Sequence, residues 1–239
     1  MHLTDHLEEL RKRLIVVFVA IAVATVGSYY FAEDLFRLLM SPLLGVMPAE
    51  SGLIFTSLTE TFFTYLKISL LAGFFAASPV VIYQIWRFSA PGLYAKEKRY
   101  VFPFVFFATV FFVGGATFGY FVVFPFGFKF FMGFATDFIT PMPTVKEYFS
   151  FSVRLLFAFG VVFELPVVTA FLALFGLISS KTLVNKRKYA VLGSFVVAAL
   201  LTPPDVVSQL MMAGPIIVLY EVSIVVARIC GRKKTDNDE

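Results

Sequence analysis

Long apolar segments separated by short polar ones follow one another along the whole chain. A helix needs roughly 20 apolar residues to cross a hydrocarbon core of about 30 Å. The strands of a membrane barrel would instead alternate apolar and polar positions, whereas these segments are apolar on every face. We therefore predict an all-α polytopic membrane protein with six transmembrane helices, at residues 14–31, 62–86, 100–124, 149–175, 189–202 and 206–227.

Proline recurs inside these segments or at their ends, at Pro79, Pro103, Pro125, Pro166 and Pro215. Each proline removes a backbone hydrogen bond and can bend its helix. Because bent helices of unequal length form a concave shape more easily than a tight cylinder, we expect a bent, concave bundle.

The third segment contains Gly114, Gly115 and Gly119, and small residues of this kind permit close approach of two membrane helices. The many phenylalanines around them are expected to face lipid or to pack between helices. The following segment, 125–150, is long enough for a short surface helix or cap.

The fifth segment is short, since fourteen helical residues span only about 21 Å. We expect the bilayer to thin there or the helix to be shielded by protein. The alternative is that Arg187 and Lys188 extend to the membrane surface and lengthen the effective span.

The amino-terminal stretch LTDHLEELRKRL places leucines at helical spacing on one stripe. This pattern predicts an amphipathic helix that lies on the membrane surface before the first span. Ion pairs between Glu8 and Lys12 and between Glu9 and Arg13 would stabilise it by a few tenths of a kcal/mol. We expect a single membrane domain over residues 1–239, with this segment at 1–13, the six helices within 14–227 and a tail at 228–239.

Composition and charge agree with a membrane protein. The chain is 59% hydrophobic and 15% charged, with a net charge of +4. Lysine and arginine gather in alternate polar segments, which predicts that both termini are cytoplasmic. These basic residues are spread over loops beside the membrane as orientation requires, so nucleic-acid binding is not expected. The basic segments are 11–13, 87–99, 181–188 and 228–234.

The sequence contains few residues suited to catalysis or to metal binding. Cys230 is the single cysteine, which excludes an internal disulfide and a thiolate metal cluster. Both histidines, His2 and His6, lie in the amino-terminal segment, and no H-E-x-x-H or G-x-S-x-G motif is present. We therefore expect no catalytic residues, no metal and no cofactor.

One carboxylate, Glu164, stands inside the apolar run FAFGVVFELPVVTAFLALFG. An ionisable group at that depth costs on the order of 3 kcal/mol if it faces lipid. Three interpretations stay open: a polar spot for partner docking or membrane thinning, a structural hydrogen bond, and a proton relay. Lys67 is a possible counter-ion.

A second acidic position stands out on the side of the membrane predicted to be cytoplasmic. Glu97 lies among Lys96, Lys98 and Arg99 in the segment RFSAPGLYAKEKRY. This segment and the amino-terminal one flank neighbouring spans, so Glu9 and Glu97 could form one acidic spot within a basic field. The alternative is an ordinary run of solvated charges.

Four motifs in this order, HLEELRKRL, FSAPGLYAKEKR, FGVVFELPVV and LLTPPDVVSQ, resemble the TatC family over residues 6–227. The resemblance implies the core receptor and scaffold of the twin-arginine protein translocase in a bacterial or archaeal cytoplasmic membrane. Its implied partners are the twin-arginine signal peptides of folded precursors, TatA and TatB, and further copies of itself. Transport would be driven by the proton motive force.

The resemblance also assigns roles to individual residues. Signal-peptide binding falls on Glu9 and Glu97, with Arg11, Phe88, Pro91 and Leu93 in the same motifs. The intramembrane glutamate is Glu164, partner contacts fall on Thr202 and Gln209, and structural positions of the outer loops are Pro42 and Asp205. Lys98 departs from the family pattern, in which arginine is frequent at this position.

An ion-coupled secondary transporter is the alternative function. Such proteins place several polar residues around a site at the middle of the membrane. Here Glu164, Lys67, Glu60 and Glu221 alone approach that description, so we favour the protein-export function.

Overall fold

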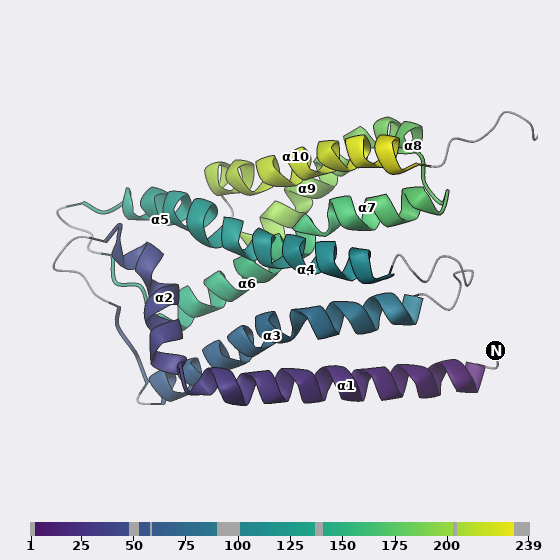
Figure 1. Ribbon diagram of the computed structural model, residues 1–239. Coiled ribbons are helices and arrows are strands. Elements are labelled where there is room, and N and C mark those ends of the chain that lie inside the picture. Colours follow the sequence, from purple (N-terminus) through teal and green to yellow (C-terminus); the bar gives the residue numbers. More distant parts are fainter. Residues whose placement is uncertain are drawn as a thin grey trace, which may run out of the picture. The chain divides into compact units, whose positions relative to one another are not determined.

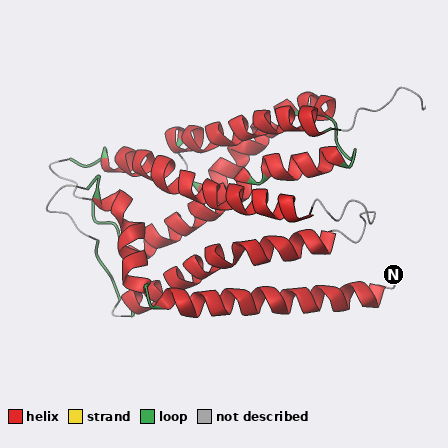
Figure 2. Ribbon diagram, in the orientation of Figure 1, coloured by secondary structure: helices red, strands yellow, loops and turns green. Residues whose placement is uncertain are grey.

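The computed structural model describes residues 3–47, 53–57, 59–89, 101–136, 141–202 and 205–231. Regular structure in these residues is helical, apart from isolated bridge positions such as the parallel bridge between Ile54 and Thr144 (Figure 2). The all-α class is confirmed. The helices are labelled in Figure 1: α1 (Leu3–Tyr29), α2 (Ala32–Leu44), α3 (Glu60–Ser89), α4 (Val101–Phe118), a π-helical turn (Gly119–Val123), α5 (Phe124–Met132), α6 (Val145–Phe163), α7 (Leu165–Leu174), α8 (Ser180–Asn185), α9 (Arg187–Leu201) and α10 (Val206–Cys230).

Several of these helices are long and apolar enough to cross a membrane. Within the described residues four helical stretches qualify, and α1 with α2 makes a fifth if the pair, bent by 86°, is one broken span. Helix α9 has 15 residues, or about 22 Å of helix. The short fifth helix is thus present, whereas the six-span count and the orientation of the termini stay predictions. The four stretches are Glu60–Phe88, Val101–Met132, Val145–Leu174 and Val206–Cys230.

One expectation about the amino-terminal region is wrong. In the described residues no separate surface helix precedes the first span, because α1 continues from Leu3 to Tyr29. The segment 32–61, between the first two predicted spans, contains the helix α2. In α2 the buried residues Ala32, Leu39, Met40 and Leu43 recur at helical spacing on one face. This amphipathic pattern is shorter than a membrane span, so the apolar length of the sequence does not reveal it.

The described helices form two compact units, Met1–Val113 with Phe124–Val153 and Gly114–Val123 with Arg154–Glu239. We describe each unit by itself, and the concave bundle and the single domain stay predictions. In the first unit α1 and α3 lie side by side (Figure 1). A Cβ atom on Gly73 of α3 would lie 2.6 Å from the backbone nitrogen of Thr25 in α1. Glycine at this position therefore permits the close packing of the two helices.

In the second unit α10 packs against α7 and α9. The segment Gly114–Val123 contacts the end of α6, where the Phe118 ring lies 5.6 Å from that of Phe159 and 5.4 Å from that of Phe163. A Cβ atom on Gly119 would lie 3.2 Å from the Phe159 ring, and one on Gly115 would collide with the Phe159 carbonyl oxygen. Close packing is thus confirmed for Gly115 and Gly119, while a Cβ atom on Gly114 would meet no atom of another described helix within 4 Å.

Candidate functional site

The first turns of α1 contact the last turns of α3. Arg13 donates to Oε1 of Glu9, the predicted partner one turn away, and its Nη1 donates to the backbone oxygen of Gln84 in α3 at 3.3 Å. The Arg13 side chain is only 13% exposed and that of Glu9 28%. A few residues further along, the His6 ring stacks on the Phe88 ring at 4.5 Å. The carboxylate of Glu9 is therefore held beside the end of α3.

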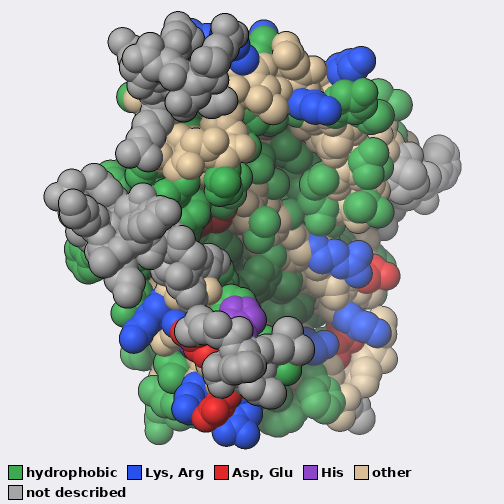
Figure 3. All heavy atoms as spheres, turned by 90° about the vertical axis from the view of Figure 1, so that its right-hand side faces the viewer, with side chains coloured by type: hydrophobic (Ala, Val, Ile, Leu, Met, Phe, Trp, Pro, Cys, Tyr) green, Lys and Arg blue, Asp and Glu red, His purple; other side chains and the backbone are tan. Residues whose placement is uncertain are grey.

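Other charges in this region are exposed. Glu8 and Lys12 form the second predicted ion pair at 2.8 Å, with side chains 57% and 69% exposed. Arg11 is exposed, while Phe88 is half-buried. Figure 3 shows acidic and basic side chains gathered over the first turns of α1. This surface offers a carboxylate among cations at the end of the α1–α3 pair.

The other predicted signal-peptide residues, Pro91, Leu93 and Glu97, lie outside the described residues, in the segment that follows α3. The proximity of Glu9 and Glu97 therefore stays a prediction. Before this segment the described residues end at Ser89, directly after Phe88.

Glu164 stands at a break between α6 and α7. Pro166, the second residue of α7, has no backbone N–H and its ring would clash with the preceding turn, so the helix cannot continue unbroken. The Oε1 atom of Glu164 is buried and has no hydrogen-bond partner within the described residues. The structural-hydrogen-bond interpretation therefore finds no support at this atom, and the contact with Lys67 stays a prediction.

The two predicted partner-contact residues lie at the end of α9 and at the start of α10. Thr202 ends α9, and its hydroxyl donates to the Ala198 carbonyl oxygen at 2.9 Å. Gln209 lies in the first turn of α10, where its backbone amide donates to the Asp205 carbonyl oxygen at 3.2 Å. Both side chains are partly exposed.

Asp205 caps α10. The Ser208 amide donates to its Oδ1 at 2.7 Å and the Ser208 hydroxyl donates to its Oδ2. These hydrogen bonds from Ser208, led by that of the hydroxyl, hold the pKa of Asp205 below its usual value. Asp205 therefore satisfies an amide that the helix itself cannot bond.

Pro42 and Glu60 belong to the described parts of the loops expected on the outer side. Pro42 lies in the last turn of α2, next to Leu43, which is buried. The buried carboxylate of Glu60 accepts from the amide of Thr56 and, across 86 positions, from the amide of Lys146, both at 2.8 Å. The sequence pattern marked Glu60 only as a polar residue for the transporter alternative, because no local pattern reveals a contact over that separation.

No three histidine, cysteine or acidic side chains gather in the described part of the chain.

Comparisons with known proteins point to transport. The family model for the Sec-independent protein translocase protein TatC matches residues 5–215.

Relatives of this description cover nearly the whole chain. TatC from Desulforapulum autotrophicum is 52% identical over 236 residues, covering 99% of this chain and 87% of the relative. TatC from Aquifex aeolicus is 42% identical and covers 99% of this chain and 98% of the relative. A crystal structure of the twin-arginine translocase receptor TatC superposes with a TM-score of 0.83 at 41% identity, covering 95% of this chain and all of that one. The chain therefore belongs to the TatC family and is a core membrane component of the Sec-independent, or twin-arginine, protein translocase, a transport subunit without enzymatic activity.

Proposed function

We propose that this chain is the signal-peptide receptor of the translocase and that Glu9 and Glu97 together bind the arginine pair of the signal peptide. The observation that carries the proposal is the position of Glu9, which Arg13 holds beside the end of α3. Glu97 lies eight residues after Ser89, the last residue of α3, so a short chain segment connects that end to the second carboxylate. Arg11, Phe88, Pro91 and Leu93 border the same region in the sequence.

The carboxylates of Glu9 and Glu97 are suited to the recognition of arginine. A guanidinium is a planar fork with five donors, and a carboxylate has about four acceptor positions. Glu9 can therefore accept from an incoming guanidinium while Arg13 still donates to its Oε1. A lysine ammonium cannot reproduce the parallel pair of hydrogen bonds. The nearby cations Arg11 and Lys12 would repel cationic segments that lack this geometry.

We assign partner docking to the second unit. The unpaired Oε1 of Glu164 carries a desolvation cost that a donor from a neighbouring membrane helix would remove. Single-span proteins of the TatA and TatB type are the proposed source of that donor, with Thr202 and Gln209 as further contacts. Self-association of the chain within a larger complex is part of the same proposal.

The proposed location is the cytoplasmic membrane of a bacterium or archaeon, with both termini in the cytoplasm. The charge asymmetry of the loops supports this orientation. Transport would be driven by the proton motive force. Membership of the TatC family favours this export function over the ion-coupled transporter alternative.

The test is site-specific crosslinking of a twin-arginine peptide to the protein in native membranes. Photoreactive groups near positions 9 and 97 are expected to capture a peptide with two arginines and to lose it when both are lysines. Glu9→Gln, Glu97→Gln and Glu97→Ala should each reduce capture at least tenfold, since each removes a charge-assisted hydrogen bond.

Glu8→Gln is the matched control, because Glu8 is one residue away and its ion pair with Lys12 is exposed. Undiminished capture in both Glu97 variants would overturn the proposal. Equal capture of the two-lysine peptide would remove the recognition mechanism.

A further inference from the structure

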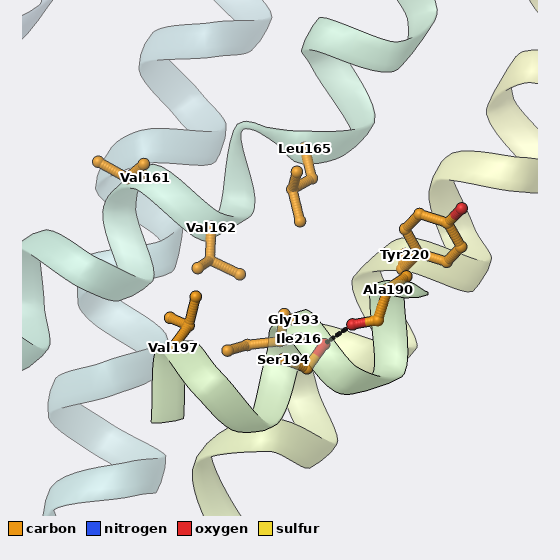
Figure 4. A pocket seen from close by; sticks show the side chains of 9 residues that line it. All are labelled: Val161, Val162, Leu165, Ala190, Gly193, Ser194, Val197, Ile216 and Tyr220. Carbon is orange, nitrogen blue, oxygen red and sulfur yellow. Dashed lines mark hydrogen bonds between the residues drawn. The ribbon is translucent and has the colours of Figure 1, made fainter. Parts of the chain in front are cut away.

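An apolar groove of about 300 Å³ opens in the second unit, between the α6–α7 break, α9 and α10 (Figure 4). Val161, Leu165, Gly193, Val197, Ile216 and Tyr220 line it. The Ser194 hydroxyl also reaches the groove, but it donates to the Ala190 carbonyl oxygen at 2.7 Å. The groove therefore offers an occupant hydrocarbon contacts.

The lining of the groove faces outward from the unit, since Val161 is 61% exposed and Val197 is 37% exposed. The stretches that contain Val161 and Ile216 are apolar enough to span a membrane. A lipid acyl chain matches this apolar surface.

A cluster of cations lies at one end of the groove. Ala190 lines the groove, and Lys186, Arg187 and Lys188 directly precede it at the start of α9. The ammonium groups of Lys186 and Lys188 lie 5.2 and 5.1 Å from the centre of the Tyr189 ring. Neither lysine makes an ion pair within the described residues, whereas Arg187 pairs with Glu221 of α10 at 2.6 Å.

Lys186 lies at the junction of two helices, as the C-cap of α8 and the N-cap of α9. Lys188 is the second residue of α9, whose first turn contains no acidic residue. The amino terminus of a helix carries a partial positive charge and favours anions, so an anionic group fits beside Lys188.

Helix α8 holds the cluster in place. The Tyr220 hydroxyl donates to the Leu183 carbonyl oxygen at 2.8 Å, while the Tyr220 ring lines the groove. The same tyrosine thus links α8 to α10 and lines the groove.

We propose that this face is a binding site for an anionic phospholipid. Its headgroup phosphate lies between Lys186 and Lys188 at the start of α9, and one acyl chain lies in the groove past Gly193 toward Val197. Basic residues beside membrane helices bind anionic headgroups in this way. A zwitterionic lipid offers the same hydrocarbon but no net negative charge, so the site selects by charge.

The experiment measures lipid retention by native mass spectrometry of the detergent-purified full chain, titrated with phosphatidylglycerol or phosphatidylcholine. The wild type should retain phosphatidylglycerol at least fivefold better. Lys186→Ala and Lys188→Ala should each lower that retention about fivefold. Gly193→Leu should abolish it, because a Cβ there meets no atom within 4 Å among the described residues and the leucine side chain would occupy the groove that Gly193 lines.

Matched controls separate the site from general effects. A Cβ at Gly214 in α10 also meets no atom within 4 Å in the described part of the chain, and Gly214 is not among the residues that line the groove, so Gly214→Leu should keep the wild-type preference. Lys129→Ala in the first unit should keep it too. Inorganic phosphate should not displace the lipid, whereas efficient displacement would show an ion site without lipid and overturn the proposal.

Three further results would also overturn it. These are equal retention of the two lipids by the wild type, equal effects of Gly193→Leu and Gly214→Leu, and crosslinking of a partner helix to position 193 without any change of lipid retention in Gly193→Leu. None of these outcomes bears on the signal-peptide site, which a separate experiment tests.

Discussion

Arg13 joins two helices through one guanidinium: it donates to the carboxylate of Glu9 in its own helix and to the backbone oxygen of Gln84 in α3. The group is largely buried, unlike the neighbouring Lys12. A pair of residues one turn apart is ordinary on an exposed helix. Burial against a second helix makes this pair a means of positioning Glu9.

We expect Arg13→Ala to weaken binding of a twin-arginine peptide about tenfold, because Glu9 loses the hydrogen bond that orients it. Arg13→Lys should restore part of the affinity, since it keeps the charge but not the fork. Peptide affinity in purified protein is the measurement. Lys12→Ala is the control and should change affinity less than twofold. Tighter binding by Arg13→Ala would show that Arg13 competes with the peptide instead.

Gly73 permits the close approach of α1 and α3, so a methyl group there should be costly. Gly73→Ala is expected to lower the free energy of unfolding by about 1 to 3 kcal/mol through overpacking. The change in melting temperature in detergent measures it. Gly27→Ala in α1 is the comparison, because a Cβ built there meets no atom within 4 Å among the described residues. That variant should be neutral or stabilising; equal losses in both would contradict the packing argument.

Two variants of Glu164 distinguish a requirement for a polar side chain from a requirement for an ionisable one. If a partner helix donates to its carboxylate, Glu164→Gln should support normal export, because the amide keeps an acceptor oxygen, while Glu164→Leu should lose most of it. Export of a folded twin-arginine reporter measures both. An inactive Glu164→Gln with intact partner crosslinking would instead favour a proton relay.

Asp205 should stabilise the protein in a manner that depends on pH. The pKa of Asp205 is lower in the folded state than in the unfolded chain, where it is about 3.9. Its contribution to the free energy of unfolding is therefore complete above that pH and fades as pH falls through the pKa of the folded state. The wild type should melt at a higher temperature than Asp205→Ala at pH 7, and this difference should shrink below about pH 4. Asp205→Asn should keep a cap that does not titrate. A difference that stays constant down to pH 3 would be inconsistent with this cause.

Glu60 should hold the segment 53–57 to the start of α6. Glu60→Ala leaves the amides of Thr56 and Lys146 without their acceptor, so protease cleavage in this region should accelerate and the melting temperature should fall. Limited proteolysis followed by mass spectrometry locates the cleavage. Glu147→Ala, an exposed acid close by, should behave as the wild type. Equal cleavage of the two variants would argue against a role for Glu60 in these contacts.

The sequence by itself determined the all-α membrane class, the positions of the apolar helices, the short fifth helix and the two ion pairs of the amino-terminal segment. It could do so because helical periodicity, apolar length and pairs one turn apart are local properties. The break at Glu164 is local as well, because Pro166 follows two residues later. The family motifs added the transport function through resemblance.

Only the tertiary structure decided which of these residues meet. Three contacts join positions far apart in the chain: Arg13 with Gln84, Gly73 with Thr25, and Glu60 with Lys146. The continuity of α1 depends on such contacts. The physical reason is that packing between helices is set by which faces fit together, and many arrangements share the same apolar pattern. An apolar position predicts burial in lipid or protein, whereas its neighbour is known only once the helices are placed.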